Sequence, residues 1–220
     1  MNAVVEADVY VDVLCPWSYI GKRRLEAALA DMSEPGRVRL RWRSFELSPD
    51  EPRTPTLTAA ASMAEWWGEH GAARVEHIHA LARAEGLGID LHRARPVNTF
   101  DAHRLYQMGA EHGLGDAVME RLLRGYLCEG LNVSDPQVLE RLGGEAGLDA
   151  AQVRDMLAGS RYADRVRADE RTARERGVTG VPTLVLDGGP PVSAVQSPAQ
   201  LRRLLEDGLR ATRAEHALDR

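Results

Sequence analysis

A cysteine stands where an apolar, β-branched run gives way to a helix-forming stretch. Residues 9–14 are typical of a buried strand, and Cys15-Pro16-Trp17-Ser18 follows directly. Proline suits the first turn of a helix, because its missing N–H would have no partner there. Unpaired N–H groups at a helix start favour an anion, so we expect Cys15 to have a lowered pKa and to act as a nucleophile. Taken alone, Cys15 could equally be a small buried hydrophobe.

A glycine-rich approach to a later strand supplies a second candidate feature. Residues 177–181 read Gly-Val-Thr-Gly-Val and lead to Pro182, which opens the apolar run of residues 182–186. Proline is tolerated at the first position of a strand but not inside a central ladder. A cis Val181–Pro182 bond would leave the Val181 backbone free to pair with a substrate. An ordinary trans proline that begins the strand is the alternative.

The elements around these residues follow the order β-α-β, helical block, α-β-β-α. Alternation over residues 38–47 predicts a second strand, and apolar residues spaced three and four apart predict helices from about 58 to 176. Asp135 and Asp149 are expected to begin two of these helices. Strands at 182–186 and 192–195 are expected to form a hairpin. A last amphipathic helix is expected to begin at Ser197-Pro198.

Composition excludes several classes of protein. The net charge of −5 over 220 residues argues against a nucleic-acid partner. No apolar run is long enough for a membrane helix, and the first ten residues lack a signal-peptide pattern, so we expect a cytoplasmic protein with no membrane partner. Abundant Ala and Arg suggest a bacterial genome rich in GC.

The cysteine and histidine contents are also informative. Two cysteines, Cys15 and Cys128, cannot make a disulfide scaffold. Seven scattered histidines predict no metal site, and His77 and His79 are two apart and would point to different helix faces. The basic run of residues 22–24 is typical of a solvated helix face.

Four separated motifs together resemble the FrnE-like branch of the DsbA superfamily. They are Cys-Pro-Trp-Ser-Tyr-Ile-Gly-Lys-Arg-Arg at 15–24, Arg-Ser-Phe-Glu-Leu at 43–47, Asn-Thr-Phe-Asp-Ala-His-Arg-Leu at 98–105 and Val-Thr-Gly-Val-Pro at 178–182. The resemblance covers nearly the whole chain. It implies an α/β thioredoxin fold with an inserted all-helical domain, a cis proline facing the cysteine, and thiol–disulfide chemistry. We expect residues 1–53 and 165–220 to form the thioredoxin-like domain and residues 54–164 the insertion.

One position departs from the family pattern. The family usually has Cys-Pro-Trp-Cys, and Ser18 stands here in place of the second cysteine. A dithiol enzyme releases its mixed disulfide with the second thiolate, and serine cannot perform that step. By the resemblance, Cys15 is the nucleophile and Val181-Pro182 forms the opposite wall.

Three functions remain open. Cys15 could work as a monothiol oxidoreductase, with a small thiol or Cys128 resolving the mixed disulfide. Alternatively, Ser18 could orient a bound thiolate, which resembles kappa-class glutathione transferases and 2-hydroxychromene-2-carboxylate isomerases acting on aromatic molecules. A non-catalytic binding or accessory protein in polyketide-type secondary metabolism is the third function. We expect no tightly bound cofactor, with glutathione or mycothiol as candidate co-substrate.

Further residues are candidates for contact with a thiol or disulfide substrate. Asn98 could cap a helix instead, His103 could be a satisfied interface residue, and Ser197 could be a helix N-cap. We expect Trp17 to be exposed and Phe45 to pack under the site. Adjacent Trp66 and Trp67 predict a groove wall or a homodimer contact. The candidates for substrate or thiol binding are Pro16, Trp17, Val181, Phe45, Asn98, His103, Gln196 and Ser197.

Overall fold

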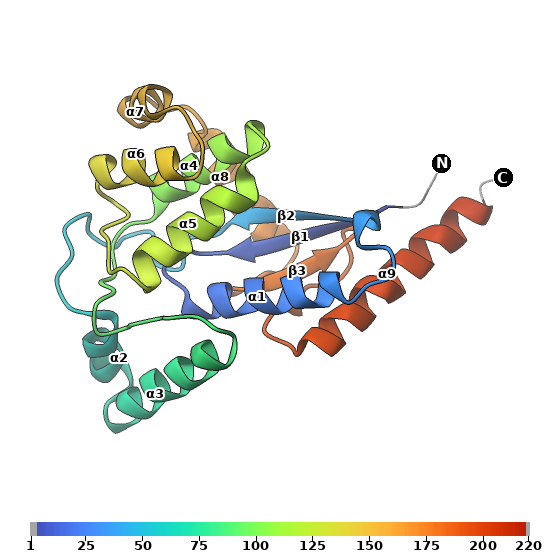
Figure 1. Cartoon of the computed structure of the whole chain (residues 1–220), viewed down its shortest axis with the longest axis horizontal. Coiled ribbons are helices and arrows are strands. Elements are labelled where there is room, and N and C mark those ends of the chain that lie inside the picture. The colour runs from blue at the N-terminus through green and yellow to red at the C-terminus, as the bar shows by residue number, and fades with distance from the viewer. Residues whose placement is uncertain (1–3, 219–220) are drawn as a thin grey trace.

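The computed structural model describes residues 4–218 and places a four-stranded mixed sheet among the helices (Figure 1). The strands are β1 (Val5–Val11), β2 (Val38–Ser44), β3 (Thr183–Leu186) and β4 (Val192–Ser193), in the order β2-β1-β3-β4. β1 runs parallel to β2 and antiparallel to β3, and β3 pairs antiparallel with β4. The expected hairpin of β3 and β4 is confirmed.

Among residues 4–218, three helices pack beside the sheet, and six more come from the segment between β2 and Ala163. The first group contains α1 (Pro16–Ala30), α8 (Ala163–Glu175) and α9 (Pro198–Leu218). The second contains α2 (Ala59–Trp67), α3 (Glu69–Ala84), α4 (Phe100–Glu111), α5 (Gly115–Leu127), α6 (Pro136–Glu145) and α7 (Ala150–Ala158). A short 3-10 turn, Pro35–Arg37, precedes β2. This arrangement of helices around a mixed sheet is an α/β fold, as expected.

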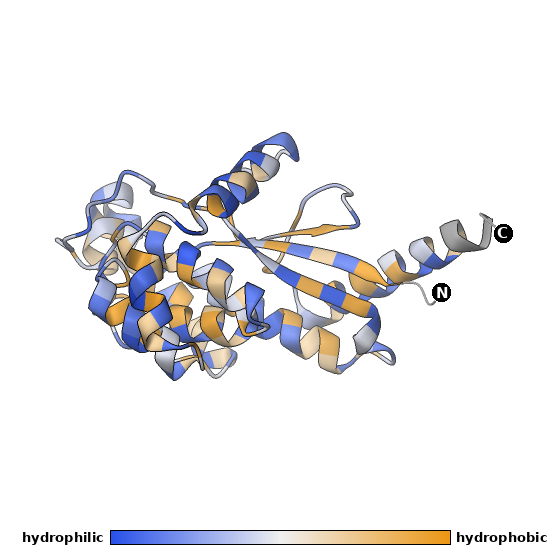
Figure 2. Ribbon diagram, turned by 90° about the horizontal axis from the view of Figure 1, so that it is seen from above, coloured by the Kyte–Doolittle hydropathy of each residue, from blue (hydrophilic) through white to orange (hydrophobic). Residues whose placement is uncertain are grey.

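Alternation along the central strand assigns one helix set to each face of the sheet. Val9 and Val11 of β1 join a core with Ile20 of α1 and Leu201 of α9. Tyr10 points the opposite way and packs with Ala173 of α8. Successive side chains of a strand point to opposite faces, so α1 and α9 cover one face and α8 the other. Figure 2 shows the matching alternation of hydrophobic and hydrophilic residues along the strands.

The element boundaries differ from expectation in several places, and β2 and β4 end at Ser44 and Ser193, earlier than the predicted 47 and 195. β1 ends at Val11, so residues 12–14 leave the sheet as a loop and not as part of the strand. The long helical stretch is interrupted by irregular chain between α3 and α4. The expected helix starts are confirmed, because Asp135 accepts the N–H of Gln137 and Asp149 accepts the N–H of Gln152.

The apolar core continues from the sheet into the helices. α4 is buried along most of its length, from Asp101 to Gly109, because it packs against α5, α6, α7 and α8. One apolar cluster includes both Val9 of the sheet and Leu122 of α5. The division into a thioredoxin-like domain and an insertion stays a prediction. No helix among residues 4–218 is both long and apolar enough to cross a lipid bilayer.

The basic run in α1 is not a solvated face. Lys22 is buried beside Trp42, and it pairs with Glu26 and with Asp116 of α5. Its long aliphatic stem fills core space while its ammonium meets carboxylates at the rim. The prediction for residues 22–24 was therefore wrong for Lys22, because the approach of α5 is a tertiary feature.

Candidate active site

Cys15 occupies the N-cap of α1, just after the C-terminal end of the central strand β1. Its backbone is extended (φ −84°, ψ 113°), and Pro16 is the first helical residue. The Cys15 N–H donates to the Asp12 carbonyl oxygen at 3.1 Å, which closes the turn between strand and helix. The Ser18 N–H donates to the Cys15 carbonyl oxygen at 3.0 Å. The strand-to-helix placement predicted from the sequence is thus present.

The opposite wall is the segment that leads into β3. The Val181–Pro182 bond is cis, as expected. The Cys15 thiol donates a hydrogen bond to the Val181 carbonyl oxygen, with 3.5 Å between Sγ and O. Gly21 permits this close approach of α1, because a Cβ there would lie 2.9 Å from Cγ of Pro182 and 3.1 Å from the Ala194 carbonyl oxygen. The two sequence motifs therefore meet at the sulfur.

The Cys15 thiol is protonated at neutral pH. Only 4% of the residue is exposed. Burial is the largest influence and raises the pKa of Cys15 to about 11, with a smaller contribution from the Asp12 charge. Hydrogen bonds from the Ser18 side chain and from the Ser18 and Trp17 amides act in the opposite direction on this pKa. The expected lowering of the pKa is wrong for this structure, because desolvation of the sulfur outweighs the donors of the helix start.

Ser18 is completely buried and is oriented toward the sulfur. Its hydroxyl oxygen accepts the Asp12 N–H at 3.3 Å. That bond occupies the oxygen, so the hydroxyl proton is available to the Cys15 sulfur. The Ser18 side-chain hydrogen bond favours the ionised form of Cys15. In this position serine can stabilise a thiolate but cannot form a disulfide.

Asp12 is a buried acid beside the site that the sequence analysis did not single out. Its carboxylate accepts the N–H groups of Leu14, at 3.3 Å, and Leu47, at 2.7 Å. It also meets the His103 Nε2 atom of α4 at 3.3 Å. An acid at the end of a strand, three residues before a cysteine, was the available signal. It was overlooked because residues 9–14 were assigned to a strand.

His103 does not line a groove. It is completely buried, so it cannot touch a substrate, and the expectation that it contacts a thiol or disulfide substrate is corrected. Asn98 supports the start of α4, although Thr99 is the N-cap residue. The Asn98 side-chain oxygen accepts the N–H of Phe100 at 3.1 Å, and its amide group donates to the Pro49 carbonyl oxygen at 2.8 Å. Direct binding by Asn98 stays a prediction.

Two hollows lie beside Trp17, and Cys15 itself lines neither of them. A hollow of about 640 Å³ lies between Trp17, the segment 177–183 and the segment around β4. A smaller hollow of about 90 Å³ lies on the other side of Trp17, against α2 and α3. Trp17 is half-buried instead of exposed, because its ring packs on His77 with 5.9 Å between centroids. Phe45 packs in the same apolar cluster as Val181, on the α8 face of the sheet.

The start of α9 follows the capping alternative. The Ser197 hydroxyl donates to the side-chain oxygen of Gln200 at 2.8 Å, and the Gln200 N–H donates back to that hydroxyl at 3.4 Å. Gln196 donates to the Ser193 carbonyl oxygen at 3.0 Å. A carboxylate-binding role for Gln196 and Ser197 stays a prediction.

Cys128 has surroundings unlike those of Cys15. Both are free thiols. Cys128 is half-buried at the end of α5, and its main electrostatic neighbours are Arg124 and Glu129. Burial raises its pKa as well. The structure joins the two sulfurs by no bond, so a resolving role for Cys128 stays a prediction.

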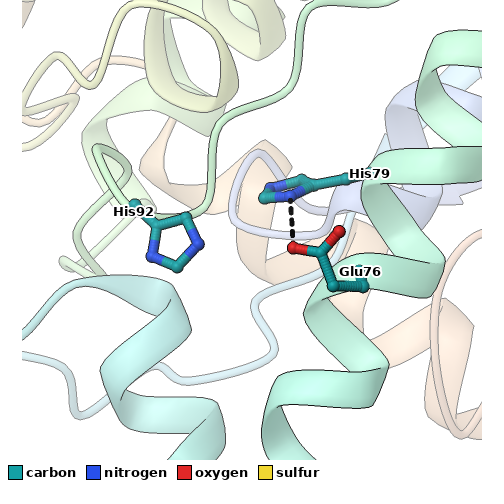
Figure 3. Close-up of side chains that lie close together, drawn as sticks. All are labelled: Glu76, His79 and His92. Carbon is teal, nitrogen blue, oxygen red and sulfur yellow. Dashed lines mark ion pairs between the residues drawn. The ribbon is translucent and has the colours of Figure 1, made fainter.

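Glu76, His79 and His92 form a cluster that the sequence analysis did not foresee, because His92 comes from the irregular chain after α3 (Figure 3). Their nearest ligand atoms lie within 4.8 Å of one another. However, Nε2 of His79 accepts the Leu91 N–H at 3.1 Å, so the neutral ring carries its proton on Nδ1, 3.8 Å from Glu76. Neither nitrogen offers a free lone pair, and the cluster is poorly suited to a metal ion.

Comparison with known proteins agrees with this geometry. The DSBA-like thioredoxin domain matches residues 6–206. The crystal structure of a probable DsbA oxidoreductase from Streptomyces coelicolor is 35% identical, with a TM-score of 0.87, over 93% of this chain and 89% of that one.

Two more distant structures share the fold. The cytosolic disulfide reductase DsbM from Pseudomonas aeruginosa, solved with GSH, is 21% identical with a TM-score of 0.64, covering 93% of this chain and 99% of that one. A 2-hydroxychromene-2-carboxylate isomerase is 17% identical with a TM-score of 0.64, covering 97% and 98%. The match over most of the chain and the 35% identity show that this chain belongs to the DsbA-like thioredoxin family.

Proposed function

We propose that this chain is a thiol–disulfide oxidoreductase that works through Cys15 alone, with glutathione or mycothiol as co-substrate. The observation that carries the proposal is the position of the Cys15 sulfur between the Ser18 hydroxyl and the Val181 carbonyl, where Val181 also lines an open hollow. The similarity to a probable DsbA oxidoreductase and to a disulfide reductase solved with GSH supports the same chemistry.

The proposed cycle has two exchanges. In the first, Cys15 gives its proton to solvent and its thiolate attacks a disulfide, forming a mixed disulfide and releasing one thiolate. In the second, a small thiol attacks the mixed disulfide, regenerating the Cys15 thiolate and releasing a new disulfide. No electrons are gained or lost by the protein over the cycle, and Ser18 donates a hydrogen bond to the thiolate in both steps.

A second candidate function is that of a glutathione-transferase-like or isomerase enzyme on an aromatic molecule. The observation in its favour is that Cys15 stays protonated at neutral pH, whereas Ser18 is placed to donate to a sulfur. A bound thiol could then supply the reactive sulfur. The third function is that of a binding or accessory protein, which would show no thiol-dependent turnover.

Intact-mass measurement after incubation with glutathione disulfide or mycothiol disulfide at pH 8.5 tests the proposal. We expect a gain of one thiol on the wild type and on Cys128→Ala, and none on Cys15→Ala. Added reduced thiol should then return the original mass. A gain that persists in Cys15→Ala, or no gain on the wild type, would contradict the proposal. Catalysis that survives in Cys15→Ala with a thiol cofactor would favour the transferase-like alternative.

The remaining proposals concern setting and assembly. The relative solved with GSH is described as cytosolic, and we propose the same compartment for this chain. We also propose a homodimer that contacts through Trp66 and Trp67. These tryptophans stack edge-on with 5.7 Å between centroids and are 58% and 40% exposed.

A further inference from the structure

Beneath Cys15 lies a charge pair that the proposed exchange does not use. The Asp12 carboxylate is completely buried, as is the His103 ring that meets it. A carboxylate only accepts hydrogen bonds, so His103 Nε2 carries a proton and donates a hydrogen bond to Asp12. The two residues are 91 positions apart in the chain. A buried carboxylate is costly unless a cation or several donors compensate it, and His103 is the cation present.

Two further acids, Glu46 and Glu170, influence His103 through their charges. Glu46, which follows β2, is buried and pairs with Arg167 of α8 at 2.6 Å. Glu170 of α8 pairs with the same guanidinium at 2.8 Å. Arg167 is 45% exposed and links this group to solvent. The buried Nδ1 atom of His103 and the Oε1 atom of Glu46 each have no hydrogen-bond partner among the described residues.

We propose that His103 is a positioning residue for Cys15: as an imidazolium paired with Asp12, it offsets the carboxylate next to the sulfur and so governs how readily Cys15 loses its proton. The inference rests on the proposed function only in that it concerns the same thiol. His103 is buried and contacts no substrate, and its influence on the sulfur is transmitted through Asp12.

The charges around His103 favour the imidazolium. Burial works against it, but the hydrogen bond and charge of Asp12 and the charges of Glu46 and Glu170 outweigh burial and raise the pKa of His103. Burial and a hydrogen bond with Glu170 raise the pKa of Glu46 to about 7. As pH rises through 7, Glu46 ionises and strengthens the hold on the His103 proton. These charges act together to extend the imidazolium form of His103 to higher pH.

The test is the pH profile of Cys15 alkylation by iodoacetamide, measured in the Cys128→Ala background. In this reaction the Cys15 thiolate displaces iodide, and its proton goes to the buffer. His103→Gln removes the cation and leaves the Asp12 carboxylate with its two backbone N–H donors but no positive charge, so the profile should move to higher pH by roughly half to one unit, a three- to tenfold slower reaction at pH 8.5. Asp12→Asn should move the profile to lower pH, because the Asp12 charge raises the Cys15 pKa.

The decisive comparison is the double variant. If His103 acts through Asp12, His103→Gln should have no effect on the profile in the Asp12→Asn background. An equal slowing in both backgrounds would overturn the proposal, as would a wild-type profile in His103→Gln. His79→Gln is the matched control, since His79 is also a buried helical histidine but lies outside this network. It should leave the profile unchanged.

Glu46→Gln provides a second route if His103→Gln does not fold. It removes a charge that favours the protonated form of His103, so it should slow alkylation above pH 7, again only when Asp12 is present. No slowing would overturn the proposal. Alkylation reports on the sulfur without any disulfide, so a missing mass gain with glutathione disulfide would refute the proposed function and leave this measurement decisive.

Discussion

Gly21 is the residue on which the closeness of the two motifs depends, and Gly21→Ala tests that dependence. A Cβ at this position would lie 2.9 Å from Cγ of Pro182 and 3.1 Å from the Ala194 carbonyl oxygen. Neither atom is the free end of a flexible side chain, so α1 would have to move outward by several tenths of an ångström. Overpacking of this kind costs about 1–3 kcal/mol.

The substitution also has a favourable part that must be separated. Alanine is better than glycine inside a helix by about 0.5–1 kcal/mol. Gly144 of α6 is a matched control, because a Cβ there would meet nothing within 4 Å. Gly144→Ala therefore gains the helix propensity of alanine without any overpacking. The difference between the two variants isolates the contact with Pro182 and Ala194, and we expect it to be about 1–3 kcal/mol.

Urea unfolding followed by circular dichroism measures both variants, with equal m values as the condition for comparing them. We expect Gly144→Ala to be slightly more stable than wild type and Gly21→Ala to be less stable than Gly144→Ala. Outward movement of α1 should also lengthen the contact between the Cys15 sulfur and Val181, so alkylation of Cys15 should become faster. Equal stabilisation by both substitutions would refute the reasoning.

Three further predictions concern the Cys15 sulfur, the Glu46 carboxyl group and the exposed tryptophans. Ser18→Ala removes a donor to the thiolate, so the Cys15 pKa should rise further and alkylation at pH 9 should slow by roughly three- to tenfold; an unchanged rate would contradict the donor role. Glu46 has a folded-state pKa of about 7, above its ordinary value of 4.5, so wild-type stability should fall as pH rises from 4.5 through 7. In Glu46→Gln this part of the decline should be absent from urea unfolding at pH 5 and pH 8; an identical decline would contradict the assignment. Trp66→Ala with Trp67→Ala should convert a dimer to a monomer in sedimentation equilibrium, and a wild type that already sediments as a monomer would contradict the dimer.

Local sequence patterns were sufficient for the order of strands and helices and for the start of the site helix. The strand-to-helix placement of Cys15 follows from a β-branched run followed by proline, and both act on the chain within a few residues. The caps at Asp135 and Asp149 are equally local. The thioredoxin fold, the cis bond before Pro182 and the donor role of Ser18 were implied instead by the resemblance to the DsbA superfamily and its relatives.

The protonation of the site depended on residues that are far apart in the chain. Cys15 retains its proton because the surrounding structure removes water from the sulfur, and burial is a property of the packed molecule. His103 is an unremarkable residue on a helix until α4 brings it against Asp12.

The sequence by itself therefore predicted the order of strands and helices, because dihedral preference and periodicity are short-range. Its resemblance to a known family predicted the thioredoxin-type fold and the Val181-Pro182 wall opposite Cys15. The tertiary structure alone decided that the thiol is protonated, that His103 is paired instead of exposed, and that Gly21 must lack a side chain. Solvation and Coulomb energies depend on distances between segments, and those distances exist only after the chain has packed.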